Sequence, residues 1–212
     1  INAHLDRYNA KDKDIIVIGG GDTGSDCIGT SNRHGARSVI NFELSHKPGK
    51  NRDSSNPWPY WPFTLKTTSS HQEGVSREWS ILTKKFIGDK YNNIIGLETV
   101  NVKIDKVTGR FTEIPNSSKT WNCDMVILAL GFTGPDETLP NLLNIDMNNR
   151  GNISSNSDYQ TIKNNIFTAG DCRRGQSLIV WAISEGREAA YHIDKFLMGT
   201  STLPQKNSLG DL

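Results

Sequence analysis

Three glycines near the start of the chain have the spacing of a turn that binds phosphates. Gly19, Gly21 and Gly24 follow the apolar, β-branched run IIVI at residues 15–18, and a segment of helical character comes next. At this spacing one glycine turns the chain, one lets the backbone approach a pyrophosphate, and one lets helix and strand pack closely. The amino end of the helix offers N–H groups and partial positive charge to the phosphates. The glycines therefore predict a dinucleotide-binding site.

A carboxylate ends the next expected strand, SVINFEL at residues 38–44. Glu43 stands 19 residues after Gly24. A carboxylate at this place accepts hydrogen bonds from ribose hydroxyls and repels a 2′-phosphate, which favours NADH over NADPH. Three basic residues just beyond the strand could instead bind the extra phosphate: His46, Lys47 and Arg52. A second alternative is that Glu43 is only the exposed end of a strand.

A second pattern, far along the chain, has the character of a flavin site. The run NIFTAGDCRRG at residues 165–175 predicts a strand that ends in Gly-Asp, followed by a turn and a long helix. Such a carboxylate can bind a ribityl hydroxyl. A helix that begins near Ser177 and Leu178 would face the pyrimidine edge of a flavin, where reduction builds negative charge. By itself A-G-D indicates only a strand and a turn, but with the upstream glycines and LALGFTG at residues 128–134 it favours FAD.

Both patterns need strands and helices that place them. A short helix is expected at residues 25–35, which completes a βαβ unit. Three strand-like runs separated by turn sequences then predict an antiparallel meander at residues 79–88, 94–104 and 110–114. A buried parallel-type strand within 123–134 and a helix at 176–199 with a glycine C-cap are also expected. A single Rossmann domain would alternate strand and helix throughout, so this order favours an α/β flavoprotein with two lobes.

A long segment rich in Pro, Ser and Asn lies between the βαβ unit and the meander, at residues 45–74. It contains the run NPWPYWP, and so long a loop inside a compact domain is usually functional. Its tryptophans either cover the core or a neighbouring domain, or they contact a ligand directly.

The composition argues against several other classes of protein. Across 212 residues the formal net charge is +1, so no strong field favours nucleic acid or an anionic membrane. No apolar run approaches the roughly 20 residues that span a bilayer, and no targeting peptide is visible. The three cysteines have no C-x-x-C spacing, so they predict neither a redox dithiol nor metal or iron–sulfur ligands. Their sparse, odd number suits a reducing compartment, so we expect the cytoplasm, with an organelle as the alternative.

The chain shows no Ser-His-Asp or Cys-His arrangement with the character of a catalytic group. Hydride transfer between two cofactors does not require one, because the protein positions the cofactors and they carry the chemistry. We therefore predict binding residues and no catalytic residue.

Four stretches together resemble the glutamate synthase family: VIGGGDTGSDC, NPWPYWP, LALGF and IFTAGDCRRGQSLIVWAISEGREAA. In this order they are similar to the carboxy-terminal part of the glutamate synthase small subunit, or to the matching domain of the fused NADH-dependent eukaryotic enzyme. The similarity runs from about residue 10 to residue 198. Dihydropyrimidine dehydrogenase and ferredoxin reductases share the glycines and A-G-D, but not the tryptophan loop as well.

The resemblance implies a Rossmann-like NAD(P)H-binding domain with an inserted antiparallel meander, which is itself inserted into a discontinuous FAD-binding domain. The NAD(P)H-binding domain would be residues 13–125 and the carboxy-terminal portion of the FAD-binding domain 126–198, with a linker at 1–12 and a flexible tail at 199–212. Residues implied to bind the nicotinamide dinucleotide are Gly19, Gly21, Asp22, Thr23, Gly24 and Glu43. Gly131 would lie at the domain crossover, near both cofactors. Residues implied to bind FAD are Gly170, Asp171, Ser177, Leu178 and Ile179.

The activity implied by the resemblance is electron transfer from NADH to FAD, then through iron–sulfur clusters to an FMN on the large-subunit partner, in cis or in trans. That FMN reduces 2-iminoglutarate to L-glutamate. The amino-terminal FAD fingerprint and the cysteine-rich iron–sulfur segment are not in this sequence, so iron–sulfur clusters and FMN are expected only in other parts of the parent enzyme. A chain without an initiator methionine fits a fragment or a processed product. Two alternatives stay open: a nucleotide-binding and docking module without turnover, and another FAD/NAD(P)H reductase that feeds an iron–sulfur protein.

Overall fold

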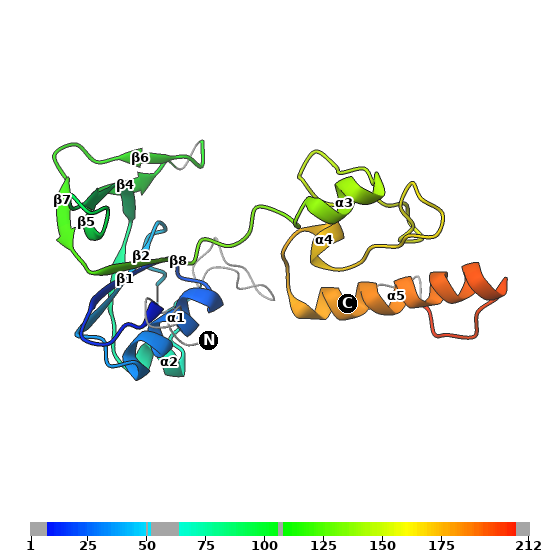
Figure 1. Cartoon of the computed structure of the whole chain (residues 1–212), viewed down its shortest axis with the longest axis horizontal. Coiled ribbons are helices and arrows are strands. Elements are labelled where there is room, and N and C mark those ends of the chain that lie inside the picture. Colours follow the sequence, from blue (N-terminus) through cyan, green and yellow to red (C-terminus); the bar gives the residue numbers. More distant parts are fainter. Residues whose placement is uncertain (1–7, 50, 52–63, 106–107, 207–212) are drawn as a thin grey trace. The chain divides into compact units, whose positions relative to one another are not determined.

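The structure is a computed structural model, shown in Figure 1. It describes residues 8–49, 51, 64–105 and 108–206. The tryptophan-rich run NPWPYWP, Arg52 and the end of the expected tail lie outside these residues.

The chain forms two compact units, Ile1–Gly131 and Phe132–Leu212. The division falls after Gly131, whereas the sequence places a domain boundary after residue 125. The difference arises because the strand that begins at Met125 pairs within the sheet of the first unit.

The first unit is built on a parallel sheet of four strands in the order β3-β2-β1-β8. These strands are β1 (Asp14–Ile18), β2 (Ser38–Glu43), β3 (Ser76–Trp79) and β8 (Met125–Leu128). The helix α1 (Asp22–Arg33) connects β1 to β2, which is the expected βαβ unit, and α2 (Ser69–Gln72) precedes β3. Because β1 has a neighbour on each side, its apolar run is buried, as is usual for a parallel sheet.

The core of the first unit lies on both faces of β1. Ile15 and Val17 pack with Ile28 of α1, and Ile16 packs on the opposite face with Leu97. All five side chains are at most 1% exposed. The alternation follows from the strand itself, since successive side chains point to opposite faces. In Figure 1, α1 and α2 lie on one side of this sheet and the antiparallel strands lie on the other.

The antiparallel sheet consists of β4 (Ile81–Gly88), β5 (Ile94–Ile104), β6 (Phe111–Glu113) and β7 (Lys119–Asn122). The strand β5 pairs with the other three, which confirms the α/β class with an antiparallel insertion. The strands β3 and β7 are not among those expected from the sequence. The run expected as one strand at 79–88 divides at Ser80, whose φ of +59° separates Trp79 in the parallel sheet from β4 in the antiparallel sheet.

The second unit contains the helices α3 (Thr138–Leu143), α4 (Asp171–Arg174) and α5 (Ile179–Met198). The long helix α5 agrees with the expected one, and its C-cap is Gly199, with φ of +80°. Like every helix of the described ranges, it lacks the combination of length and apolar character that crossing a membrane requires. The strand expected near 165–171 is not formed, and Phe167 makes only an isolated bridge with Gln160. The backbone of this segment bonds with residues 159–161 at two places, from the N–H of Thr168 to Tyr159 and from the N–H of Thr161 to Ile166, and the described part of this unit contains no strand that could extend the pairing.

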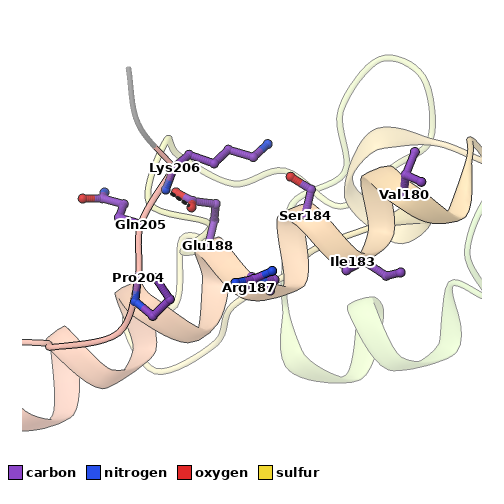
Figure 2. Close-up of a pocket in the computed structure, with 8 residues that line it drawn as sticks. All are labelled: Val180, Ile183, Ser184, Arg187, Glu188, Pro204, Gln205 and Lys206. Carbon is purple, nitrogen blue, oxygen red and sulfur yellow. Dashed lines mark hydrogen bonds between the residues drawn. The ribbon is translucent and has the colours of Figure 1, made fainter. Parts of the chain in front are cut away.

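The chain beyond α5 returns along that helix (Figure 2). The backbone N–H of Lys206 donates a hydrogen bond to Oε1 of Glu188 at 2.6 Å. A hollow of about 340 Å³ lies between α5 and Pro204, Gln205 and Lys206. As far as Lys206, the segment expected to be a flexible tail is therefore bonded to the helix.

Candidate nucleotide-binding site

The three glycines between β1 and the first turn of α1 have different surroundings. Gly19 has φ of +119°, and a Cβ there would lie 2.1 Å from the carbonyl oxygen of Ala129. A Cβ on Gly24 would lie 2.2 Å from the carbonyl oxygen of Gly19. A Cβ on Gly21 would meet no described atom within 4 Å. One glycine therefore turns the chain, one allows close packing of the helix, and one faces open space, which are the three environments that the spacing predicts.

The amino end of α1 can accept an anion. Gly21 is the N-cap, and its helix has no capping bond from a described side chain. Asp22 and Thr23 of the first turn are exposed. The first N–H groups of a helix have no partner within the helix and carry partial positive charge. This end is therefore suited to a phosphate.

A groove of about 740 Å³ opens beside the turn, at the carboxyl ends of β1 and β2. It is lined by residues 19–21 of the turn, by Glu43 and its neighbours, by residues 81–83 of β4, and by residues 129–131. In open α/β sheets, ligands bind outside the carboxyl ends of the strands, where the order of strands reverses. The reversal here falls between β1 and β8, because β2 follows β1 on one side and β8 lies on the other. The fold thus brings Gly19, Gly21, Glu43 and Gly131 to one groove.

The side chain of Glu43 lies over the turn. Its Oε1 accepts a hydrogen bond from Nη2 of Arg77 at 2.7 Å, and the side chains of Arg77 and Glu43 are 15% and 14% exposed. A Cβ on Gly20 would lie 2.1 Å from Oε2 of Glu43, so a side chain at that position would displace the carboxylate. Glu43 is therefore not the exposed end of a strand. One of its oxygens is bonded to an arginine and the other lies against the turn.

Of the basic residues that follow β2, the two that the structure describes, His46 and Lys47, do not line this groove. His46 and Lys47 are exposed, and His46 borders a separate hollow formed with residues of β5 and β6. The cation that reaches the carboxylate is Arg77 of β3, which the sequence does not reveal because β3 is not recognisable as a separate strand. The dinucleotide pattern leaves position 20 open, so it does not predict that Gly20 is needed there. The only sign of this in the sequence is the run GGG at residues 19–21.

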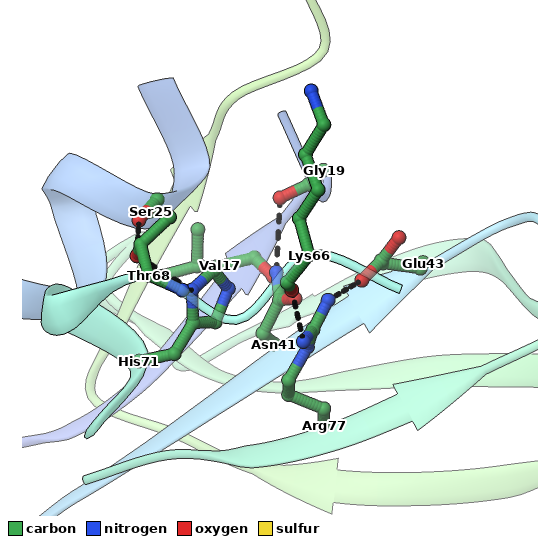
Figure 3. Close-up of polar contacts among 9 residues, drawn as sticks. All are labelled: Val17, Gly19, Ser25, Asn41, Glu43, Lys66, Thr68, His71 and Arg77. Atoms are coloured by element: carbon green, nitrogen blue, oxygen red, sulfur yellow. Dashed lines mark hydrogen bonds and ion pairs between the residues drawn. The ribbon is translucent and has the colours of Figure 1, made fainter. Parts of the chain in front are cut away.

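A buried asparagine holds the turn from within the sheet (Figure 3). Asn41 of β2 is fully buried, and its Nδ2 donates to the carbonyl oxygens of Val17 at 3.1 Å and Gly19 at 2.9 Å. Its Oδ1 has no hydrogen-bond partner among the described residues. The paired amide fixes the backbone on both sides of the last residue of β1 and so positions the first glycine. Only the register that places Asn41 beside Val17 reveals this role.

A second polar cluster joins α1 to α2 (Figure 3). Thr68 Oγ1 lies 2.5 Å from Oγ of Ser25 and 2.8 Å from Nδ1 of His71. The backbone N–H of Thr68 also donates to Nδ1 at 3.2 Å, so this ring nitrogen carries no proton. Burial and, second, the charge of Arg77 lower the pKa of His71 below its ordinary value of 6.5. The neutral ring therefore links the two helices beside the turn.

In the second unit, the residues expected to bind FAD meet at the start of α5. Oδ1 of Asp171 accepts a hydrogen bond from the N–H of Ser177 at 3.3 Å. Leu178, the N-cap of α5, and Ile179 are both exposed. Asp171 also lines a hollow of about 290 Å³, together with residues near the start of this unit.

A buried glutamate supports the same turn. The N–H of Gly170 donates to Oε2 of Glu185 at 2.9 Å, and Oε1 of Glu185 pairs with Arg173 at 3.0 Å and Arg174 at 2.8 Å. Glu185 is 1% exposed. Because Glu185 lies in the second turn of α5, it ties the Gly170–Asp171 turn to that helix. Sequence reasoning missed this residue, which looks like one more polar residue on a long helix.

The chain matches the family described as pyridine nucleotide-disulphide oxidoreductase over residues 2–186, which is most of its length. It belongs to the pyridine nucleotide-disulphide oxidoreductase family.

Several proteins similar to the chain carry the name glutamate synthase. The proteins named glutamate synthase [NADH] in Schizosaccharomyces pombe and Saccharomyces cerevisiae are 47% and 43% identical to the chain, over 95% and 96% of it. The chain covers 10% of each. The glutamate synthase [NADPH] small chain of Mycobacterium tuberculosis is 41% identical over 92% of the chain, which covers 40% of that protein. The chain thus spans a minor part of each relative, and the relatives differ in the coenzyme that their names give.

The fold of this oxidoreductase family is also found among solved structures. The crystal structure of thioredoxin reductase from T. acidophilum matches 93% of the chain with a TM-score of 0.62, and the match covers 56% of that protein. Its sequence is 19% identical. The likeness shows a shared α/β fold, to which the parallel and antiparallel sheets of the first unit belong.

The cysteines of this family member are not paired with one another. Cys27, Cys123 and Cys172 are all free. Burial, followed by nearby carboxylates, raises the pKa of Cys27 and raises that of Cys123 to about 11. A raised pKa disfavours the thiolate, which is the reactive form. Cys27 and Cys123 therefore pack against the core and are not suited to the disulphide chemistry that the family name mentions.

Proposed function

We propose that the chain is the NADH-oxidising, flavin-dependent module of a glutamate synthase. NADH is the preferred dinucleotide in this proposal and NADPH the less favoured one. The observation that carries it is the carboxylate of Glu43, held over the glycine turn at the edge of the groove. Membership of the oxidoreductase family and the similarity to two yeast proteins named for NADH support it.

In the proposed site the glycine turn binds the pyrophosphate. The N–H groups at the start of α1, including those of Asp22 and Thr23, donate to phosphate oxygens, and the open face of Gly21 lets the backbone come close. Glu43 accepts hydrogen bonds from the adenosine ribose and repels a 2′-phosphate. Apolar side chains on the groove wall exclude water from the nicotinamide end: Ile81, Phe86 and Leu130.

In the second unit, Gly170, Asp171, Ser177, Leu178 and Ile179 would hold FAD, with Gly131 at the crossover between the units. The hydrogen bond from Ser177 to Asp171 and the exposed start of α5 fit that role, because a carboxylate and a helix amino end converge there. The chemistry that FAD supplies when bound is acceptance of a hydride and release of electrons one at a time. The residues of this chain need only position the two cofactors and exclude water.

The larger reaction in this proposal is the reduction of 2-iminoglutarate to L-glutamate. Electrons reach it through iron–sulfur clusters and FMN in other parts of a glutamate synthase, either on the same polypeptide or on a large-subunit partner. The names of the relatives support this assignment. The three free cysteines suit a reducing compartment such as the cytoplasm.

A second candidate function is nucleotide binding and docking without turnover by this chain. It is favoured by the exposure of Leu178 and Ile179, which leaves the flavin side of the arrangement open within the second unit. The third alternative, another reductase feeding an iron–sulfur protein, would use the same groove. The similarity to glutamate synthases weighs against it.

The test is titration of the 212-residue chain with NADH and NADPH by isothermal calorimetry, repeated with Glu43→Ala. NADH is expected to bind more tightly to the unchanged chain, and Glu43→Ala is expected to remove that preference. Equal or tighter binding of NADPH by the unchanged chain would overturn the coenzyme assignment. Retained flavin absorbance that bleaches with NADH would separate the enzyme from the docking module.

A further inference from the structure

Arg77 lies next to Glu43, the residue proposed to select NADH, and can therefore also affect the choice of coenzyme. It lies on β3 in register with Asn41 of β2, and the side chains at alternate positions of a strand share a face, so Glu43 is on the same face as Asn41. The guanidinium thereby reaches the carboxylate that the proposed function assigns to the ribose. Nη2 of Arg77 and Oε1 of Glu43 are 2.7 Å apart.

The guanidinium has two anchors other than Glu43, of which the bond to Lys66 is drawn in Figure 3. Nη1 of Arg77 donates to the carbonyl oxygen of Lys66 at 2.9 Å, and Cζ lies 4.6 Å from the centre of the Trp79 ring. Stacking on an aromatic ring and a bond to a backbone carbonyl both fix the plane of an arginine. Removal of the Glu43 carboxylate would therefore leave the charge of Arg77 in place.

The pair has a chemical consequence for the choice between coenzymes. NADH and NADPH differ by a phosphate on the adenosine ribose, and an acidic residue at the end of β2 or a nearby arginine is what distinguishes them in this kind of site. The present site contains both an acidic residue, Glu43, and an arginine, Arg77, and the carboxylate is bonded to the guanidinium. As long as Glu43 is charged, its oxygen occupies the donor of Arg77 that a 2′-phosphate would need.

We propose that Arg77 is a specificity-determining residue whose pairing with Glu43 fixes the carboxylate for NADH and hides a binding position for the 2′-phosphate of NADPH. This proposal rests on the function proposed above. The site selects NADH by Glu43 and is one substitution away from accepting NADPH through Arg77. Arg77 acts on NADH only through the orientation of Glu43, so in the unchanged chain it is a positioning residue.

The test compares the ratio of the NADPH and NADH dissociation constants in a double-mutant cycle of Glu43→Gln and Arg77→Met, measured by calorimetry on the 212-residue chain. Glu43→Gln keeps the shape of the side chain and removes its charge. It is expected to tighten NADPH binding by about tenfold or more, the size of a charge-assisted hydrogen bond. In the double variant that gain is expected to vanish.

Arg77→Met alone is expected to weaken NADH binding and to weaken NADPH binding further, because an unpaired carboxylate remains. The matched control is Arg37→Met, which removes an arginine bound to Asp14 and Asp124 at the opposite, amino end of the same sheet. It should leave the ratio unchanged. If Arg77→Met does not fold, Arg77→Gln replaces it, since an amide can still donate to Lys66 without carrying charge.

The outcomes separate the two proposals. If neither dinucleotide binds to the unchanged chain, the proposed function fails. If NADH binds but Glu43→Gln and the double variant give the same ratio, the role of Arg77 is overturned while the proposed function stands. If Arg77 had a purely structural role, Arg77→Met would weaken the binding of NADH and NADPH equally. The ratio of their dissociation constants would then keep the value of the unchanged chain.

Discussion

The two units of the chain place their candidate binding residues by different means. In the first unit, a four-stranded sheet with buried side chains on both faces holds the glycine turn, and Asn41 bonds it from within. In the second unit, the described residues form three helices and isolated bridges, and a single buried glutamate, Glu185, holds the turn at Gly170.

The difference shows in where the apolar side chains lie. The apolar residues of β1 are buried, whereas four apolar residues in the first two turns of α5 and at its N-cap are more than half exposed: Leu178, Ile179, Val180 and Ile183. A sheet positions a site through many contacts at once, whereas the turn at Gly170 is held by a few polar contacts, of which those of Glu185 are the most buried. The effect of a substitution in the first unit should therefore scale with how tightly the side chain is packed. In the second unit it should depend on whether one particular polar contact is lost.

The largest combined effect on stability and on nucleotide binding is expected from Gly19→Ala. The new Cβ would lie 2.1 Å from a backbone carbonyl at a φ of +119°, so turn and sheet cannot both keep their places. We expect a loss of about 2–4 kcal/mol in the free energy of unfolding and loss of measurable NADH binding. Urea unfolding and calorimetric titration measure the two effects.

The control for Gly19→Ala is Gly21→Ala, where the Cβ would meet no described atom. Its stability should change by less than about 0.5 kcal/mol, while NADH binding weakens because the phosphate loses its close approach to the backbone. Full binding by Gly21→Ala would contradict the assignment of this turn to a pyrophosphate.

The second effect in size is expected from Glu185→Gln in the second unit. Glu185 is 1% exposed and faces two arginines that are 26% and 38% exposed. Neutralising it leaves both without a charged partner, and after allowance for their partial exposure we expect a loss of roughly 2 kcal/mol in the local stability of the turn. Hydrogen exchange should show faster exchange at Gly170–Ser177 and no change in β1. Equal acceleration at Gly170–Ser177 and in β1 would contradict a local role for Glu185.

The sequence predicts the features that depend on local spacing and misses those that depend on the pairing of strands. The glycine turn, Glu43 and α5 are recognisable because spacing and periodicity along the chain determine them. Arg77 and Asn41 are not, because their roles depend on the parallel register of β2 with β3 and β1, which joins residues far apart in sequence.

The two failures in secondary structure have physical causes of the same kind. The segment near Phe167 has the composition of a strand, but its pairing with residues 159–161 is limited to an isolated bridge, and the described part of the second unit contains no strand that could extend it. The run from Trp79 to Gly88 reads as one strand, and only the positive φ of Ser80 divides it between two sheets.

A smaller effect, dependent on pH, is expected from His71 in the first unit. Its pKa is lowered by burial and by Arg77, so the unfolded chain binds a proton at higher pH than the folded chain does. The stability due to the neutral ring is therefore fully present above its ordinary pKa of 6.5 and is lost as pH falls from there through the lowered pKa. His71→Gln should flatten this part of the stability profile, measured by urea unfolding from pH 7.5 to pH 5. An unchanged slope in the variant would assign the pH dependence to other groups.

The smallest effect on stability is expected from substitution of the exposed apolar residues at the start of α5, which can be compared directly with substitution of a buried residue in the first unit. Leu178→Ser together with Ile179→Ser should change the free energy of unfolding of the 212-residue chain by less than about 0.5 kcal/mol, because both side chains are already exposed. The same variant should bind less of a fluorescent dye that reports exposed apolar surface. In the first unit, Leu97→Ala removes a fully buried side chain and should cost about 2–5 kcal/mol. A large loss from the serine pair would mean that the start of α5 is packed after all. The second unit would then position its turn through many packing contacts, as the first unit does, and not mainly through the bonds of Glu185.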